Sequence, residues 1–250
     1  MPNRKNTTPC QEDPVLQLLA RGSDYVVVHK PAGIAVVQYQ GNKQPTLLEL
    51  MQELVADNIQ PVHRLDRATS GCCLFAQGPT AQRRLSFAFR NRQVDKRYLA
   101  LVEGCPQFDK TTIDLRLKRI DTPHAKKGPV ARQVVDKQGK EAISHLSVWH
   151  TGQQISAVEV RPVTGRMHQI RAHLAAIGHP VVGDRTYGSQ LCFAPNAIAL
   201  LAFALRFRIS SNKHKSVTSH LPEQFVARTQ ADGFDIRQQF AKTTQRFCSQ

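Results

Sequence analysis

Apolar and alternating segments follow one another along the chain from residue 25 onward, and their periods predict its secondary structure. Such runs predict β-strands over residues 25–29, 72–76, 97–104, 143–149 and 155–161. The run 197–209 predicts a further core strand, although its period alone also fits a helix. The adjacent Cys72 and Cys73 lie within one strand, so their side chains should face opposite sides of it.

Three segments have apolar side chains at helical spacing: residues 46–54, which begin with a capping-box pattern, 79–92 and 166–177. Strands outnumber helices and often follow one another directly. This order predicts an α+β fold, with a mixed, mostly antiparallel β-sheet core flanked by helices and loops. The chain contains no G-x-G-x-x-G or P-loop pattern, which argues against kinases, NTPases and dehydrogenases.

The composition is that of a globular protein, with 41% hydrophobic and 21% charged residues among 250. We expect a flexible polar arm over residues 1–20, one domain over 21–230, and a loose tail over 231–250 with at most one further helix. The N-terminus has no apolar stretch after its basic residues, and the longest apolar run, 197–205, is too short to cross a bilayer. Secreted and membrane-spanning proteins are therefore not predicted.

Cysteine and histidine spacing bears on location and metals. The six cysteines include no C-x-x-C pair, and the ten histidines lack cysteine or carboxylate partners at zinc-ligand spacing. We therefore expect reduced thiols, a cytoplasmic location and no bound metal. Nothing in the sequence indicates an oligomer, so a monomer is the default expectation.

The charge balance points to a polyanionic partner. Lys and Arg number 34 against 19 Asp and Glu, giving a net charge of +15 and a pI near 10.0, which favours nucleic acid over an anionic membrane. Residues 116–140 hold eight basic and two acidic residues with Pro and Gly among them. We interpret this stretch as a mobile basic loop that clamps phosphates; a merely solvated loop is the alternative. Aromatic residues are only 6%, which favours a folded RNA stem-loop over single-stranded nucleic acid.

Two stretches carry candidate chemistry. In residues 62–71, Asp66 lies between Arg64 and Arg67 just before an apolar strand, and flanking cations favour its ionised form. In residues 164–174, Arg171 lies beside the apolar stripe of a predicted helix. Taken separately, the first stretch is more often a structural Asp–Arg bridge in a surface turn, and the second a solvated helix face.

Together, these stretches resemble the RluA-type pseudouridine synthase family. The resemblance includes the H-R-L-D-R-x-T-S-G string around Asp66, the K-x-Y-x-A-x-V-x-G pattern from Lys96, and G-R-x-H-Q-I-R-x-H-L from Gly165, and it extends through Gly183-Asp184 and Tyr187-Gly188. It covers about residues 22–226, which makes residues 21–230 the expected catalytic domain. It implies the pseudouridine synthase fold with a catalytic cleft across the sheet. It also implies conversion of uridine in RNA to pseudouridine without cofactor or metal.

The resemblance also implies roles for individual residues. Asp66 would be the nucleophile at the anomeric carbon of the ribose, and Arg171 would pair with it. Tyr98 would stack on the uracil and help to remove the proton from its carbon 5. Arg64 would fill the space left by the flipped base. The remaining candidates for RNA binding or for support of the site are His63, Arg67, Thr69, Arg166, His168 and Lys30.

Two departures from the family pattern and two alternatives remain. Relatives commonly have a histidine where this chain has 200–204, and many carry an N-terminal RNA-binding module that twenty residues cannot form. A non-catalytic RNA-binding protein on the same fold would need a broken Asp66, Tyr98 and Arg171 set, and all three are present. A glycosidase would need a second carboxylate, for which Asp184 is the candidate. The sequence leaves open whether the target is ribosomal or transfer RNA, and which uridine.

Overall fold

The computed structural model describes residues 16–39, 41–122, 130–210 and 212–249. Its strands are β1 (Gln17–Arg21), β2 (Tyr25–Lys30), β3 (Ile59–Pro61), β4 (Ser70–Gln77), β5 (Asp95–Glu103), β6 (Lys110–Asp114), β7 (Leu117–Thr122), β8 (Val130–Val135), β9 (Ile143–Thr151), β10 (Ile155–Pro162), β11 (Leu200–Ser210) and β12 (Lys213–Thr218). Its helices are α1 (Leu47–Leu54), α2 (Pro79–Arg90), α3 (Gln169–Ala176), the 3₁₀ turn η1 (Arg185–Tyr187), α4 (Glu223–Gln230) and α5 (Arg237–Ser249).

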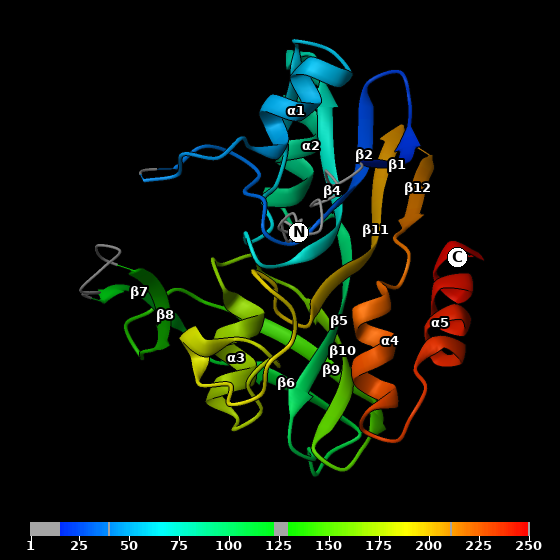
Figure 1. The fold of residues 1–250 in the computed structure, drawn as a ribbon. Coiled ribbons are helices and arrows are strands. Elements are labelled where there is room, and N and C mark those ends of the chain that lie inside the picture. Colours follow the sequence, from blue (N-terminus) through cyan, green and yellow to red (C-terminus); the bar gives the residue numbers. More distant parts are fainter. Residues whose placement is uncertain (1–15, 40, 123–129, 211, 250) are drawn as a thin grey trace, which may run out of the picture.

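One large sheet runs through the molecule in the order β1-β2-β4-β11-β5-β10-β9-β6, with β3 paired to β4 and β12 to β11. Its pairings are antiparallel except that of β4 with β11, which is parallel. Helices α1 and α2 pack at one end of the sheet, whereas α3 lies to the left of the central strands and α4 and α5 to the right (Figure 1). The α+β fold with a mixed, mostly antiparallel sheet is confirmed.

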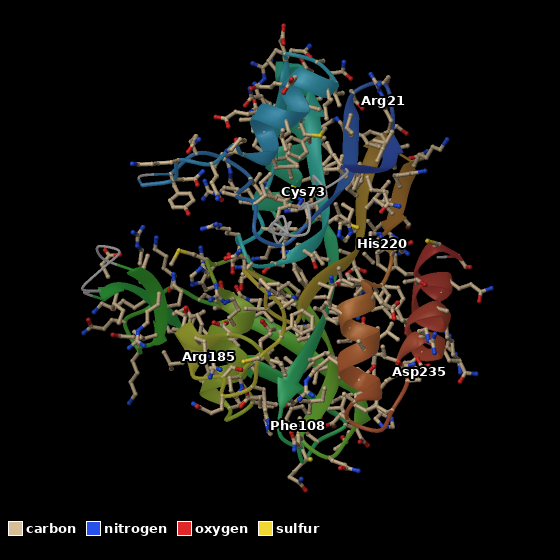
Figure 2. The ribbon with its side chains drawn as sticks, viewed as in Figure 1. Arg21, Cys73, Phe108, Arg185, His220 and Asp235 are labelled. Atoms are coloured by element: carbon tan, nitrogen blue, oxygen red, sulfur yellow. The ribbon has the colours of Figure 1, made fainter. Side chains whose placement is uncertain are left out.

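The hydrophobic core is divided by the sheet. The largest cluster joins β5, β10 and β11 to α3, α4 and α5 through residues such as Leu174, Phe225 and Phe240. Cys72 and Cys73 belong to two different clusters, as expected for neighbours in a strand. Figure 2 shows Cys73 in the upper half of the molecule, where its cluster includes side chains of α1. The strands are therefore buried on both faces around the centre of the sheet.

Three local expectations need correction. Residues 17–20 belong to β1, which pairs with β2, so these residues are not part of a flexible arm; residues 1–15 of that prediction lie outside the described part of the chain. The predicted basic loop contains the antiparallel hairpin β7–β8, and residues 123–129 of that prediction also lie outside the described part. The predicted helix 166–177 begins only at Gln169, because His168 has a φ of +51° and cannot continue a right-handed helix.

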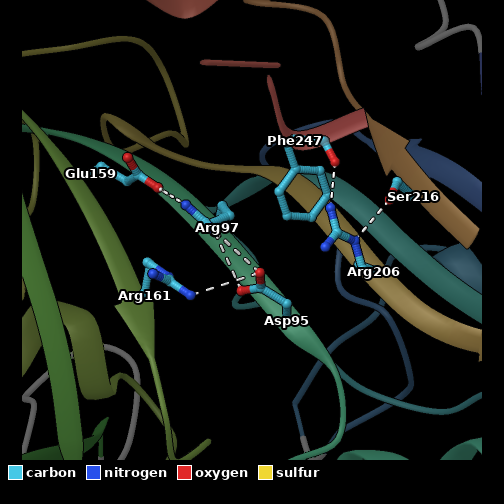
Figure 3. A network of polar contacts seen from close by, with 7 residues as sticks. All are labelled: Asp95, Arg97, Glu159, Arg161, Arg206, Ser216 and Phe247. Atoms are coloured by element: carbon cyan, nitrogen blue, oxygen red, sulfur yellow. Dashed lines mark hydrogen bonds and ion pairs between the residues drawn. The ribbon is translucent and has the colours of Figure 1, made fainter. Parts of the chain in front are cut away.

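The segment after residue 231 is not loose, because α5 packs against the sheet (Figure 3). Arg97 of β5 binds Asp95 and also Glu159, whose Oε1 lies 2.7 Å from its Nη1. The Phe247 ring lies under the guanidinium groups of Arg97 and Arg206, at 5.3 and 4.7 Å from the ring centroid. The Phe247 carbonyl also accepts a hydrogen bond from Arg206. The last helix thus packs against β11 and β12 and contacts β5 through Arg97.

None of the helices in the described ranges combines the length and the apolar character that a membrane span requires.

Candidate active site

The opposite face of β5 borders a cavity of about 690 Å³. Residues 61–66 and 162–171 line it, although they are far apart in the sequence. Strand β5 contributes Lys96 and Tyr98, and the neighbouring β11 contributes Leu200. The cleft therefore lies over adjacent strands of the sheet, and it collects the two sequence stretches that carry candidate chemistry.

Asp66 lies in the loop between β3 and β4, and a buried lysine holds this loop in place through hydrogen bonds. Lys30 is fully buried, and its Nζ donates to the carbonyls of Pro31, Ile34 and Arg67 at 2.8, 2.9 and 3.1 Å. Burial lowers the pKa of Lys30 to about 8. The residue next to Asp66 is thereby held against the turn that follows β2.

Further bonds hold both sides of the same loop. The Arg67 Nε donates to the Gly33 carbonyl at 2.7 Å, and the Gly33 N–H donates back to the Arg67 carbonyl at 2.8 Å. His63 accepts the Leu74 N–H at its Nε2 (3.0 Å) and stacks on Phe89. Burial lowers the pKa of His63 to about 3, so its ring is neutral. The loop is a rigid support rather than a solvated turn.

A glycine lets the chain turn from this loop into the sheet. Gly71 has a φ of +113°, and a Cβ there would lie 2.2 Å from the Ala202 carbonyl oxygen of β11. No other residue fits between the two parallel strands without moving their backbones. The small residue after Thr69-Ser70 therefore sets how closely the Asp66 loop approaches β11.

Arg171 projects from α3 and joins two carboxylates. Its Nε and Nη2 donate to Asp184 at 2.6 and 2.9 Å, and its Nη1 donates to Asp66 at 3.2 Å. The Asp184 side chain is 1% exposed, whereas that of Asp66 is 23% exposed and borders the cavity. Burial opposes the charge of Arg171, but the bonds to Asp184 and the charges of both carboxylates raise its pKa. The bidentate pair with Asp184 fixes the guanidinium, which then holds Asp66.

Tyr187 and His168 complete this cluster. The guanidinium of Arg171 lies over the Tyr187 ring at 5.0 Å from its centroid. The Tyr187 hydroxyl accepts the N–H of Gln133 in β8 at 2.8 Å and lies 3.2 Å from His168 Nδ1. The other ring nitrogen of His168 is 3.8 Å from Asp66 Oδ2, and burial lowers the pKa of His168. The hairpin is thus connected to the carboxylate through two side chains.

Tyr98 lies on β5 on the cavity side, opposite Val160 and Ala202 of the neighbouring strands. Burial, and then the charge of Asp66, raise the pKa of its hydroxyl strongly, so Tyr98 stays neutral. A neutral phenol is a poor proton acceptor. The geometry offers a flat aromatic surface beside Asp66 and gives little support to Tyr98 as a base.

The structure brings most of the predicted residues to the cavity, but not all of them. Its lining includes Asp66, Arg171, Tyr98, Arg64, Arg166, Thr69, His168 and His63. Lys30 and Arg67 are not in the lining, because Lys30 is buried beneath the loop and Arg67 points to Gly33 and Gln44. Their geometry indicates support of the loop. The buried Thr69 hydroxyl has no hydrogen-bond partner within the described residues.

Sequence reasoning missed three side chains of the site. Asp184 was weighed only as the acid of a glycosidase, and Lys96 and Tyr187 received no role. All three belong to the sequence motifs on which the resemblance rests, so their positions could have marked them as candidates. Nothing in the local sequence gave a physical reason to assign them a role. No described group of three or more His, Cys, Asp or Glu side chains is arranged to hold a metal ion.

Comparisons with known proteins agree with this site. A model of the RNA pseudouridylate synthase family matches residues 24–176. An RNA pseudouridine synthase of Zymomonas mobilis, described as uncharacterized, is 37% identical over 207 residues, covering 82% of this chain and 93% of that protein. The dual-specificity RNA pseudouridine synthase RluA of Escherichia coli is 35% identical over 188 residues, covering 74% of this chain and 82% of RluA.

A solved structure is similar as well. The human RNA pseudouridylate synthase domain containing 1 matches with a TM-score of 0.68 and 30% identity, covering 83% of this chain and 84% of that chain. The match of the family model, the relatives over most of their length and the shared fold all point the same way. The chain belongs to the RluA-type RNA pseudouridine synthase family, and it is an enzyme that isomerises uridine in RNA.

Proposed function

We propose that the cavity receives one uridine flipped out of a folded RNA and that Asp66 is the nucleophile. The observation that supports this most directly is the Asp66–Arg171–Asp184 cluster, in which Asp66 is the carboxylate that borders the cavity. A carboxylate is suited to attack at the anomeric carbon, because sugar centres react through oxocarbenium-like states.

The reaction can be written without a co-reactant. Asp66 bonds to C1′ as the bond from C1′ to N1 of uracil breaks. The free uracil turns, C5 bonds to C1′, and the Asp66 ester breaks. The proton on C5 leaves and N1 takes one up, so the product has the mass of the substrate. The partly closed cavity holds the detached base during the turn.

Each neighbour has a role that its contacts support. Arg171 orients Asp66 through its hydrogen bond, while Asp184 keeps Arg171 in place. Tyr98 stacks on the uracil. The exposed Arg64 borders the cavity and enters the stack in place of the flipped base, which offsets part of the few kcal/mol that flipping costs.

We also propose which kind of RNA the protein binds and where in the cell it acts. The exposed Arg166 beside the cavity and the basic hairpin β7–β8 favour a stem-loop of ribosomal or transfer RNA bound through its backbone. Free thiols at Cys72 and Cys73 favour a cytoplasmic location. We propose that the protein acts there as a monomer, without cofactor or metal.

The alternatives predict different products. In a glycosidase, Asp184 would be the acid, but both of its oxygens accept from Arg171. A non-catalytic RNA-binding protein would leave RNA unchanged. RNA from cells lacking this protein is incubated with the wild type and with Asp66→Asn, its pseudouridines are mapped, and its mass is measured. New pseudouridine at constant mass with the wild type alone supports the proposal. Full activity of Asp66→Asn, or release of free uracil, contradicts it.

A further inference from the structure

Lys96 begins the K-x-Y pattern on β5 and has no role in the proposal above. Successive residues of a strand face opposite sides, so Lys96 and Tyr98 share the cavity face and Arg97 faces α5. Both side chains line the cavity. Their Cα atoms are about 7 Å apart along the strand.

The ammonium group of Lys96 has few partners. Its one described hydrogen bond is a long one, 3.4 Å, to the carbonyl of Thr164, and none of the described carboxylates forms an ion pair with it. Asp95 faces the other side of β5, where Arg97 and Arg161 bind it. Burial lowers the pKa of Lys96 to about 8; Asp95 opposes this shift and Arg92 adds to it. An incompletely solvated ammonium group gains from an anion placed beside it.

The other cations of the cavity lining differ from Lys96: Arg64 and Arg90 are exposed, and the two arginines nearest to Lys96 in this wall have acceptors. Arg92 also lines the cavity, but its guanidinium binds Glu141 at 2.6 Å. The Nε of Arg166 donates to the Glu141 carbonyl at 3.0 Å. Among the described residues, Lys96 is therefore the partly buried cation of the cavity lining that lacks a strong hydrogen-bond acceptor.

The size of the cavity fits more than a base. A volume of about 690 Å³ is in the range of sites that enclose drug-sized molecules. With uracil on Tyr98 and the ribose at Asp66, the phosphate lies beyond the ribose along the cavity. We expect that position to be within reach of Lys96, which lies on the cavity face two residues before Tyr98.

We propose that Lys96 binds a backbone phosphate of the flipped uridine, so that the cavity recognises a nucleotide and not a base alone. This proposal rests on the placement of uracil on Tyr98 in the proposed function. The phosphate contact positions the nucleotide for Asp66 and is made with any uridine that enters. Lys96 thus contributes to affinity and alignment, while selection among uridines comes from elsewhere.

The first test uses small probes: uridine, uridine 5′-monophosphate and uridine 3′-monophosphate, with affinity measured by NMR titration. The wild type should bind one monophosphate about tenfold or more tightly than uridine. Lys96→Gln should bind all three alike, and Lys96→Arg should keep most of the preference. The control Lys110→Ala changes an exposed lysine of the edge strand β6 and should behave as the wild type. Equal affinity of the wild type for all three, or an unchanged preference in Lys96→Gln, overturns the proposal.

The second test follows the affinity for a stem-loop RNA with uridines in its loop as salt is varied. Loss of one phosphate contact should lower the salt slope by about 0.7 to 0.9 in Lys96→Gln and not in Lys110→Ala. A merely structural role would leave the slope unchanged. Thermal unfolding of each variant shows that it is folded. If Asp66→Asn is inactive while Lys96→Gln retains the wild-type slope, the proposed function stands and the assignment of Lys96 is wrong.

Discussion

Two arginines of this protein have nearly the same surroundings but different uses. Arg171 binds two carboxylates and lies over the Tyr187 ring; Arg97 binds two carboxylates and lies over the Phe247 ring. They lie on opposite sides of the central sheet, Arg171 in the cleft and Arg97 beneath α5.

The two sites differ in how many of their carboxylate oxygens are already bound. Behind β5, Glu159 also accepts from Trp149, and Asp95 lies near Arg161 as well as Arg97. In the cleft, Asp184 is fully used by Arg171, but Asp66 accepts one bond of 3.2 Å and borders the cavity. The same motif therefore serves as a structural clamp where every carboxylate oxygen is occupied, and as a candidate reactive site where Oδ1 of Asp66 accepts no hydrogen bond from the described residues.

The largest expected effect separates the two partly exposed carboxylates. Asp66→Asn should lower pseudouridine formation by about 10⁴-fold or more, because the nucleophile is lost. Asp95→Asn should leave activity within a few-fold of the wild type. Both are compared by pseudouridine formation on the same RNA, and equal losses in the two variants would contradict the distinction.

A second pair compares the buried partners. Asp184→Asn and Glu159→Gln each remove a charge that faces an arginine, and each should lower the free energy of unfolding by about 3 kcal/mol. Asp184→Asn alone should lower kcat further, by about 10²-fold, because Arg171 and Asp66 lose their alignment. Urea unfolding and single-turnover rates measure the two effects. A Glu159→Gln enzyme as slow as Asp184→Asn would show that the clamp also acts on catalysis.

The aromatic ring behind the sheet should matter only for stability. Phe247→Ala should cost about 3 to 5 kcal/mol, because the ring is buried in contact with two guanidinium groups. Activity per folded molecule should be retained below the unfolding transition. Calorimetry and an assay at low temperature test this, and lost activity in a fully folded variant would be evidence against it.

The smallest effect is a pH dependence in the cleft. The pKa of Lys96 in the free protein is lowered to about 8, and only its ammonium form attracts phosphate. RNA affinity should therefore be constant below about pH 7 and fall a few-fold as the pH rises to about 9. Two titratable groups that line the cavity with Lys96 keep their charge state over this range: the pKa of Arg92 is raised by its hydrogen bond to Glu141, and burial lowers the pKa of His63 to about 3. The decline should be absent in Lys96→Gln; an identical decline there would assign it to another group.

The sequence predicted the elements well where the pattern was periodic. The predicted strands and the helices 46–54 and 79–92 form close to the predicted bounds, since their burial agrees with their local preference. The hairpin β7–β8 was missed because its apolar residues do not alternate: Leu117 and Ile120 are three residues apart and so belong to opposite faces of β7. The packing of the C-terminal segment was underestimated because the sequence of α5 is mostly polar. Phe240 and Phe247 of this helix are nevertheless both buried.

The site was predicted from resemblance more than from physics. The pairing of Asp66 with Arg171 was expected and is confirmed at 3.2 Å. The left-handed backbone of His168 could not be foreseen, because no rule of helix propensity excludes histidine there. Nor could the burial of Lys30 be foreseen, since lysine is among the residues most often exposed.

The three carbonyl groups around Lys30 shield its amine from reagents in solution for as long as the loop before β4 stays closed over it. An acylating label applied in short pulses would spare Lys30 in intact molecules and mark it only in those whose loop has opened. The labelled fraction, read by mass spectrometry at a single peptide, would report how often the support beneath Asp66 opens, without any dye attached to the protein.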